Sequence, residues 1–224
     1  MMNCTEILMA KDKMEEECGV FGIYSKEINE VAQITYYGLY ALQHRGQESA
    51  GISVSNFGEI VTYKGMGLTA DVFTPETLNN LVGNAAIGHV RYSTTGASKL
   101  ENAQPLESRY KLGQIAVAHN GNLTNAKIIR ELLEDAGSTF NTSIDSEVII
   151  KMIARKANGN VEDATRSTVG AIKGAYALVI LAGNKLVGVR DPYGIRPLCL
   201  GINENGDYIL ASESCAIDAV GGTL

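Results

Sequence analysis

Cys18 is the residue of this chain best suited to act as a nucleophile. It opens the apolar, glycine-spaced run Cys18–Tyr24, which is typical of a buried strand, and it follows a polar leader that ends in three glutamates. If the leader is removed, one residue carries both a thiol and a free α-amine, that is, a nucleophile and its base. The competing interpretation is a small core residue at the start of a strand, because free cysteines are often buried and inert.

The leader does not have the features of a secretory signal. It contains no apolar segment of ~7–15 residues, and Lys11, Asp12 and Lys13 interrupt it. No run in the chain approaches the ~18 apolar residues of a membrane span. The four cysteines are scattered without C-x-x-C spacing, so neither a zinc site nor a disulfide framework is indicated. We therefore expect a cytoplasmic protein with no membrane partner and no metal or cofactor in this chain.

The composition is that of a globular protein. With 224 residues, of which 45% are hydrophobic, the chain can bury a substantial core in one domain or in a domain plus a fragment. The net charge is −6, and no basic stripe is present that would bind nucleic acid. The 24 glycines lie between apolar runs, which indicates tight turns and close backbone approaches.

Further polar stretches interrupt apolar segments where a purely structural sequence would not need them. They are Gln43–Gly51 after a predicted helix, Gly88–Gly96 at the end of a predicted strand, and His119–Asn122 at the end of another. Each has an ordinary interpretation, since Asn-Gly after a strand is commonly a turn and a strand-end arginine is commonly solvated. Ser143–Glu147 precedes a helix and fits an N-terminal capping pattern.

The elements that position these stretches alternate between strands and helices. Short turns at 56–59 and 183–185 predict antiparallel hairpins, and the whole pattern fits packed sheets with helices outside. We predict strands over Gly19–Tyr24, Gly51–Ser55, Ile60–Tyr63, Ala85–Val90, Ile115–His119, Ala175–Leu181, Leu186–Val189, Leu198–Ile202 and Tyr208–Ala211. We predict helices over Ile34–Gln43, Pro75–Leu81, Asn125–Ala136, Asp145–Ala157 and Val161–Ile172. In the third helix the apolar residues Ile128, Ile129, Leu132 and Leu133 recur at helical spacing.

Together the polar stretches resemble one family. The glutaminase domain of class II glutamine amidotransferases, and within that class the amidophosphoribosyltransferases, is similar to this chain over Cys18–Leu224. The stretches that carry the resemblance are Glu17–Ile23, Tyr37–Gly51, Gly88–Tyr92, Ala118–Asn122 and Asp145–Glu147, and the narrower match rests on Gln43–Glu48, Arg91–Thr94, Asn122, Asp191–Leu198 and Ala211–Glu213.

The resemblance implies an architecture and a domain division. It implies an α+β protein with the N-terminal-nucleophile (Ntn) hydrolase fold, a four-layer αββα sandwich with two antiparallel sheets. Residues 1–17 would be a propeptide, and residues 18–224 the class II glutamine amidotransferase domain. A C-terminal phosphoribosyltransferase domain would be absent from this chain.

The resemblance also implies a catalytic group of Cys18, Asn120 and Gly121. The Cys18 thiol would attack the side-chain amide of glutamine, and the Asn120 amide and Gly121 N–H would form the oxyanion hole. A thiol pKa near ~8.5 and an α-amine pKa of about 7.7–8.0 make the freed amine a suitable base. We expect Gly121 to be glycine because a Cβ would crowd the tetrahedral centre. The family uses no histidine base, so structural hydrogen bonding is expected of His44, His89 and His119.

Substrate recognition is implied for four more residues. Arg91 would bind the α-carboxylate of glutamine bidentately, and Asp145 would bind its α-ammonium. Arg45 and Gly46 would orient the Cys18 terminus beside the substrate. The segment Tyr92–Asn102 contains small polar residues and fits a loop that closes over bound glutamine.

Partners and cofactors follow from the same resemblance. The ammonia would pass to phosphoribosyl pyrophosphate in the missing domain and give 5-phosphoribosylamine, the first step of de novo purine synthesis. The full-length enzyme would be a homo-oligomer that uses Mg and, in some leader-bearing relatives, a 4Fe-4S cluster, for which Cys199 and Cys215 do not constitute a site. Two alternatives stay open: a stand-alone amidohydrolase, and a non-catalytic module in which a retained leader blocks Cys18.

Overall fold

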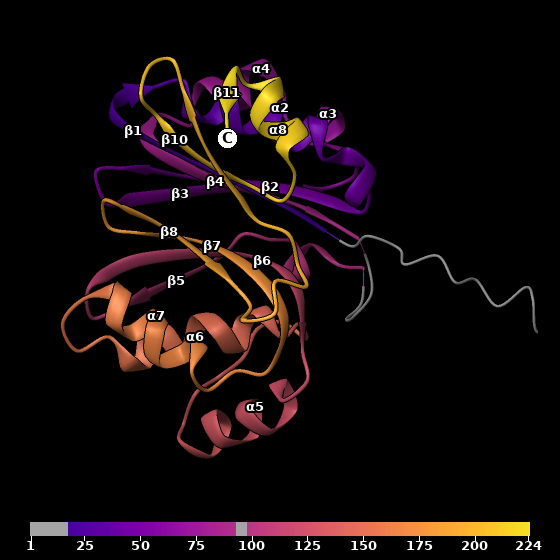
Figure 1. Ribbon diagram of the computed structural model, residues 1–224. Helices are drawn as coiled ribbons and strands as arrows, with labels where there is room; N and C mark the ends of the chain where they lie inside the picture. Colours follow the sequence, from indigo (N-terminus) through magenta and orange to yellow (C-terminus); the bar gives the residue numbers. More distant parts are fainter. Residues whose placement is uncertain (1–17, 93–97) are drawn as a thin grey trace, which may run out of the picture.

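Two antiparallel sheets pack face to face, with helices on both outer sides (Figure 1). The computed structural model describes residues 18–92 and 98–224. One sheet has seven strands in the order β11-β9-β10-β1-β4-β2-β3, and the other has four in the order β5-β6-β7-β8. This arrangement confirms the predicted four-layer sandwich. The predicted propeptide and residues 93–97 of the predicted closing loop lie outside the described residues.

The described strands and helices have the following bounds. The strands are β1 (Gly19–Asn29), β2 (Ser49–Asn56), β3 (Glu59–Met66), β4 (Gly83–Arg91), β5 (Leu106–Tyr110), β6 (Gly113–Leu123), β7 (Gly174–Ala182), β8 (Lys185–Arg190), β9 (Cys199–Asn203), β10 (Tyr208–Ala211) and β11 (Gly222–Thr223). The α-helices are α2 (Val31–Ala41), α3 (Thr69–Val72), α4 (Pro75–Asn79), α5 (Ala126–Asp135), α6 (Ser146–Lys156), α7 (Val161–Val169) and α8 (Ser214–Ala219), and short 3-10 helices cover Gln43–Arg45 and Leu100–Asn102.

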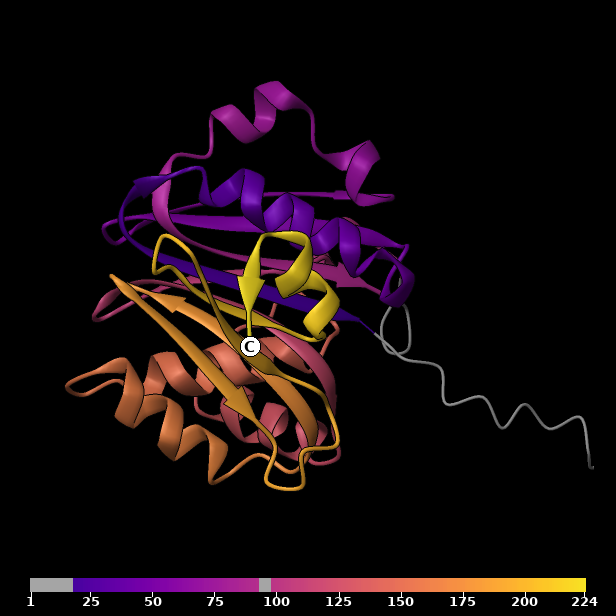
Figure 2. The same cartoon turned by 45° about the horizontal axis from the view of Figure 1, so that its top comes forward.

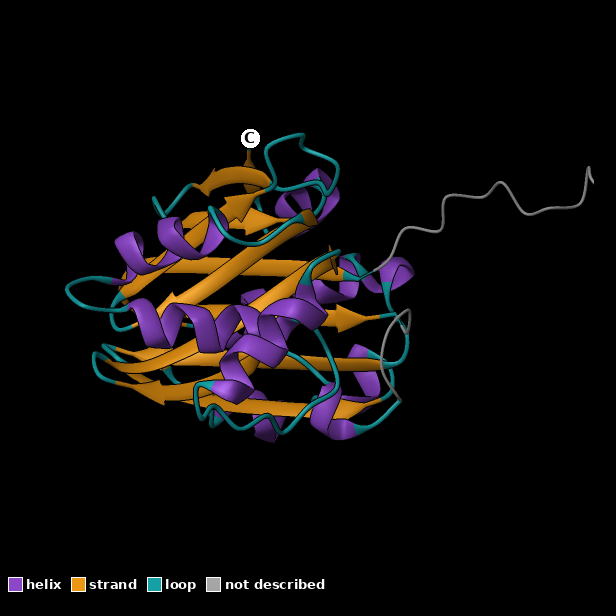
Figure 3. Ribbon diagram, turned by 90° about the horizontal axis from the view of Figure 1, so that it is seen from below, coloured by secondary structure: helices purple, strands orange, loops and turns teal. Residues whose placement is uncertain are grey.

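Strand periodicity divides the core into three layers. In β6, Ala116 and Ala118 face the opposite sheet and pack with Val20 and Val179, whereas alternate residues such as Val117 face the helices. Helices α6 and α7 cover the outer face of the four-stranded sheet (Figure 3). Helix α2 lies along the outer face of the seven-stranded sheet with α8 beside it (Figure 2). Within the described part of the chain, no helix is long and apolar enough to cross a membrane.

The ladder registers bring separate segments to one end of the sandwich. Gly19 at the start of β1 pairs with Val90 near the end of β4, and Ser49 at the start of β2 pairs with Arg91. In the other sheet, the last residues of β6 pair with the first residues of β7, so that Gly121 lies opposite Tyr176. The polar stretches identified in the sequence therefore gather at strand ends, where side chains are not required to fill the core.

Candidate active site

Cys18 lies immediately before β1 in a backbone conformation that is rare for a residue with a side chain. Its φ is +60°, in the left-handed region. Its N–H donates to the Arg45 carbonyl at 3.0 Å, and its own carbonyl accepts from Arg45 Nε at 2.7 Å. The thiol donates to the Tyr92 carbonyl across 3.6 Å. Arg45 therefore binds both the N–H and the carbonyl of Cys18, whereas the sulfur points toward Tyr92.

Four of the predicted site residues meet in one small cavity. Cys18, Arg91, Gly121 and Asp145 line it, and its other lining residues are Tyr92, Gln104, His119, Ile144 and Ser146. The cavity volume is about 20 Å³, which is room for roughly one water molecule. An amino acid therefore enters only if lining groups move. Asn120, Arg45 and Gly46 do not line the cavity, but each adjoins a residue that does: Asn120 precedes Gly121, Arg45 binds Cys18, and Gly46 packs against Arg91.

Arg91 is the last residue of β4 and is almost completely buried. Only 3% of it is exposed, and its Nη1 pairs with the Glu48 carboxylate at 2.5 Å. The Glu48 N–H also donates to the Arg91 carbonyl at 3.0 Å, which fixes the two residues relative to each other. A Cβ on Gly46 would come within 2.7 Å of the Arg91 backbone. Gly46 thus acts by close packing against β4, beneath the residue predicted to bind substrate.

Asn120 and Gly121 form the end of β6. Asn120 is fully buried, and among the described residues neither its amide nitrogen nor its amide oxygen has a hydrogen-bond partner. Gly121 has φ +144°, and a Cβ there would meet the Ala175 carbonyl oxygen at 2.1 Å. The need for glycine therefore has a different physical cause from the one expected. The close approach of β7 leaves no room for a side chain at position 121. Crowding of a tetrahedral centre is therefore not required to explain the glycine.

Asp145 directs its carboxylate toward β6. Its Oδ2 accepts from the Leu123 N–H at 2.8 Å, and Oδ1 lies 3.6 Å from His119 Nδ1. Burial acts to raise the pKa of Asp145, but His119 and the backbone N–H donors outweigh it, so the pKa lies below its ordinary value. The carboxylate is therefore ionised at neutral pH, as an ammonium-binding group must be.

The predicted capping pattern before α6 is not formed. Asp145 is the N-cap residue of α6, but its side chain makes no cap hydrogen bond. The Ser146 hydroxyl pairs with His119 Nδ1 at 3.0 Å, and the Ser143 hydroxyl accepts from Asn102 Nδ2 at 3.0 Å. Contacts with β6 and with the 100–102 turn outcompete local capping at this helix end.

Two buried histidines connect the sheets behind the cavity. His89 Nε2 donates to the His119 carbonyl at 3.0 Å, and the Gln104 side chain accepts from the His119 N–H at 2.8 Å. Burial lowers the pKa of His89 to about 3, so this ring is neutral at physiological pH. Both histidines therefore have hydrogen-bonding roles. Gln104 was missed in the sequence because it lies outside every polar stretch that drew attention.

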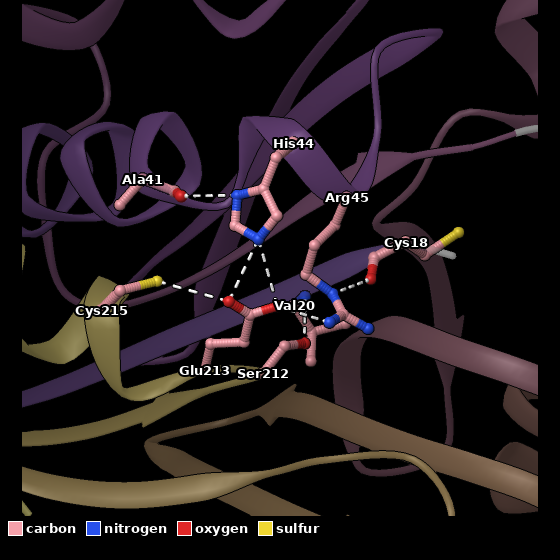
Figure 4. A network of polar contacts seen from close by, with 8 residues as sticks. All are labelled: Cys18, Val20, Ala41, His44, Arg45, Ser212, Glu213 and Cys215. Carbon is pink, nitrogen blue, oxygen red and sulfur yellow. Dashed lines mark hydrogen bonds and ion pairs between the residues drawn. The ribbon is translucent and has the colours of Figure 1, made fainter. Parts of the chain in front are cut away.

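A network of polar contacts lies on the side of Cys18 opposite the thiol (Figure 4). Arg45 Nη1 pairs with Glu213 Oε1 at 2.5 Å. The same carboxylate lies 3.1 Å from His44 Nε2 and accepts from Cys215 Sγ at 3.5 Å. Glu213 belongs to a stretch that the resemblance had marked, but its contact with Arg45 spans most of the chain and has no local signal.

The described residues do not provide a metal centre. Residues 18–92 and 98–224 contain no group of three or more His, Cys, Asp or Glu side chains that could hold a metal ion. Cys199 and Cys215 are both free thiols. The described residues therefore do not form a site for a 4Fe-4S cluster.

Comparison with known proteins defines the class to which this fold and site belong. A family model described as "Glutamine amidotransferase domain" matches residues 89–219, which is more than half of the chain. The chain therefore belongs to the glutamine amidotransferase domain family, as the sequence predicted.

The relatives narrow the resemblance to one enzyme. The chain is 50% identical to an amidophosphoribosyltransferase of Synechocystis sp. over 95% of this chain and 44% of that protein. It is also 50% identical to one of Methanocaldococcus jannaschii over 89% of this chain and 43% of that protein. The solved glutamine phosphoribosylpyrophosphate amidotransferase from B. subtilis, complexed with ADP and GMP, superposes with a TM-score of 0.85 and 45% identity over 92% of this chain and 44% of that one. The chain thus spans less than half the length of the relatives it matches.

Proposed function

We propose that this domain hydrolyses glutamine to glutamate and ammonia, with Cys18 as the nucleophile. The observation that carries the proposal is the meeting of Cys18, Arg91, Gly121 and Asp145 around one cavity. These residues come from four separate segments and two sheets. A thiol, a guanidinium and a carboxylate brought together in this way suit an amide substrate that also bears an α-carboxylate and an α-ammonium.

The chemical step begins with proton transfer from the Cys18 thiol. In a chain that starts at Cys18, the α-amine accepts this proton, and the thiolate forms a bond to the amide carbon of glutamine. The carbonyl π electrons move to oxygen as the tetrahedral intermediate forms. As the intermediate collapses, the α-ammonium of Cys18 returns its proton to the leaving nitrogen, the C–N bond breaks, and ammonia departs. Water then hydrolyses the thioester, which releases glutamate and restores the thiol.

Asn120 and Gly121 are proposed to stabilise the oxyanion. The unpartnered amide of Asn120 supports this role, because leaving a buried amide without a hydrogen bond costs about 1–3 kcal/mol. Such a cost is recovered when charge develops on the substrate oxygen, so the interaction favours the transition state over the ground state. Arg91 and Asp145 are proposed to bind the carboxylate and the ammonium, respectively. Arg45 and Gly46 are proposed to orient the Cys18 terminus, and the hydrogen bonds between Arg45 and Cys18 support this role.

In the longer protein, the ammonia is proposed to react with phosphoribosyl pyrophosphate to give 5-phosphoribosylamine. The names of the relatives and the length they share with this chain support the proposal. Residues 1–17 are proposed to be a propeptide, and a phosphoribosyltransferase domain, Mg, oligomerisation and a cytoplasmic location are proposed for the longer protein.

The test is covalent labelling of the chain beginning at Cys18 with an electrophilic glutamine analogue, followed by mass spectrometry and a glutaminase assay. We expect one adduct, on Cys18, with loss of glutamate production in proportion to labelling. Free glutamine should protect against the adduct. Labelling that glutamine does not slow, or glutamate production by Cys18→Ala, would reject the proposed function.

A further inference from the structure

We propose that Glu213 is a positioning residue for the nucleophile, acting on Cys18 through the guanidinium of Arg45. This inference rests on the proposed function of Cys18 and deepens it. It assigns a role in catalysis to a residue that does not line the cavity and that reaches the site from the far end of the chain.

Arg45 holds Cys18 in place through two hydrogen bonds. The Arg45 carbonyl accepts the Cys18 N–H at 3.0 Å, and Arg45 Nε donates to the Cys18 carbonyl at 2.7 Å. The first residue of a chain is poorly ordered unless its surroundings determine its position. These two hydrogen bonds are such a determinant. The direction of the Cys18 thiol therefore depends on where the Arg45 side chain lies.

The Arg45 side chain in turn depends on Glu213. The guanidinium is 1% exposed, so it needs an anionic partner to offset the loss of water. Glu213 Oε1 supplies it at 2.5 Å. Although burial opposes ionisation, Arg45 and His44 lower the pKa of Glu213 to about 2. The anion is therefore present throughout the pH range in which an enzyme of this kind works.

The backbone beside Glu213 is itself fixed to β1, the strand that directly follows Cys18. The neighbouring residue Ser212 accepts the Val20 N–H through its hydroxyl at 2.9 Å, and its own N–H donates to the Val20 carbonyl at 2.9 Å. The carboxylate is thus held at a constant position relative to Cys18. Figure 4 shows the network on the carbonyl side of Cys18, with the sulfur directed away from it.

A positioning role predicts a specific kinetic pattern. Removal of the charge should let the Arg45 guanidinium shift and misorient the thiol, while Arg91 and Asp145 remain in place to bind glutamine. A misplacement of about 1 Å can cost about 100-fold in rate. For Glu213→Gln we therefore expect kcat to fall by about 10- to 100-fold, with KM changed by less than about threefold.

The experiment compares wild type, Glu213→Gln and Glu213→Asp in the chain that begins at Cys18. Glutaminase kinetics are measured beside the rate of Cys18 alkylation by iodoacetamide from pH 6 to pH 10. Glu213→Gln should be alkylated more slowly or with a displaced pH profile, and Glu213→Asp should recover part of kcat because it keeps the charge. Glu162→Gln is the matched control, since it removes a carboxylate that pairs with Lys185 away from the site.

The outcomes separate this inference from the proposed function. If wild type produces no glutamate, the proposed function fails, and the alkylation profiles still decide whether Glu213 positions the Cys18 thiol. If wild type is active and Glu213→Gln matches Glu162→Gln in both kcat and alkylation, the inference is overturned. A rise in KM at constant kcat also overturns it, because Glu213 would then act through substrate binding. Thermal melts show whether each variant is folded.

Discussion

At the scale of single residues, the site combines charged groups that are already paired with buried polar atoms that are not. Arg91 contacts Glu48, and Asp145 accepts from Leu123, so both charges are held in place before any substrate arrives. Asn120 differs, because its buried amide makes no hydrogen bond within the described residues. Substitution of Asn120 should therefore lower activity without lowering stability.

Asn120→Ala should lower kcat without lowering stability. Loss of one oxyanion donor typically costs about 2.7–4 kcal/mol of barrier, or roughly 100- to 1,000-fold in kcat, while KM changes little. Because the amide has no partner to lose, we expect the melting temperature to stay constant or to rise. Steady-state kinetics and thermal melts check this. A stable variant with unchanged kcat would remove Asn120 from the oxyanion hole.

Arg91→Lys should mainly raise the glutamine KM. Lysine keeps a positive charge near Glu48 but cannot bind a carboxylate bidentately, so substrate affinity should fall by about tenfold or more, with kcat within a few-fold. The measurement is a glutamine titration of glutaminase activity beside wild type. A drop in kcat at constant KM would contradict the assignment of Arg91 to the carboxylate.

Glu213 should also give a stability signature in acid. Its folded-state pKa of about 2 lies below the ordinary value of 4.5, so the stabilisation is complete above about pH 4.5 and is lost as pH falls toward 2. The difference in unfolding free energy between wild type and Glu213→Gln should therefore shrink over that interval. Urea denaturation at pH 6, 4 and 3 measures it. A difference that is independent of pH would mean that the carboxylate is not ionised in the folded protein.

At the scale of elements, the strands and helices with long apolar runs could be predicted from the sequence, whereas the shortest elements could not. All nine predicted strands and all five predicted helices are present, mostly extended by one to several residues or shortened at their ends. Strand β5 was missed because polar Glu107 and Arg109 alternate with few apolar residues at the sheet edge. Strand β11 and helices α3 and α8 are too short to show a period.

The helix predicted over Asn125–Ala136 is present as α5, but its spacing did not show which of its apolar residues are buried. Of the four that recur at helical spacing, only Ile129 and Leu133 are buried. Ile128 and Leu132 are 62% and 63% exposed. Spacing alone predicts that a helix is amphipathic, but how much of its face a neighbour covers depends on tertiary packing. The same limit applies to Glu213, whose partner Arg45 is unrelated to it in sequence.

The two ends of β6 offer a matched test of why Gly121 is glycine. Gly121→Ala should destabilise the protein strongly, because the new Cβ would meet the Ala175 oxygen at 2.1 Å. Gly113 also has a positive φ, +117°, but a Cβ there meets nothing within 4 Å. Gly113→Ala should therefore cost only the conformational strain of about 1–2 kcal/mol. If Gly121→Ala and Gly113→Ala were equally destabilised in urea melts, the positive φ alone would explain why glycine is required at position 121.

At the scale of the whole molecule, a cavity of about 20 Å³ has to open before glutamine can bind. Residues 18–224 alone should therefore hydrolyse glutamine slowly and form no phosphoribosylamine. Adding the proposed phosphoribosyltransferase domain with phosphoribosyl pyrophosphate should raise glutaminase turnover, since binding there can shift the site toward its competent state. The measurement is the steady-state rate of glutamine hydrolysis with and without that domain. Equal turnover would favour the stand-alone amidohydrolase.

The left-handed conformation of Cys18 has a thermodynamic consequence for the proposed removal of residues 1–17. A φ torsion exists only while a carbonyl carbon precedes the residue, so a chain that begins at Cys18 has none. A chain in which a residue precedes Cys18 therefore holds roughly 1–3 kcal/mol of torsional energy at Cys18, and a chain that begins at Cys18 holds none of it. If residues 1–17 are removed as proposed, cleavage before Cys18 relieves this torsional energy, while both hydrogen-bonding groups of Arg45 stay available to Cys18. Joining the leader to the folded domain again would restore the same energetic cost.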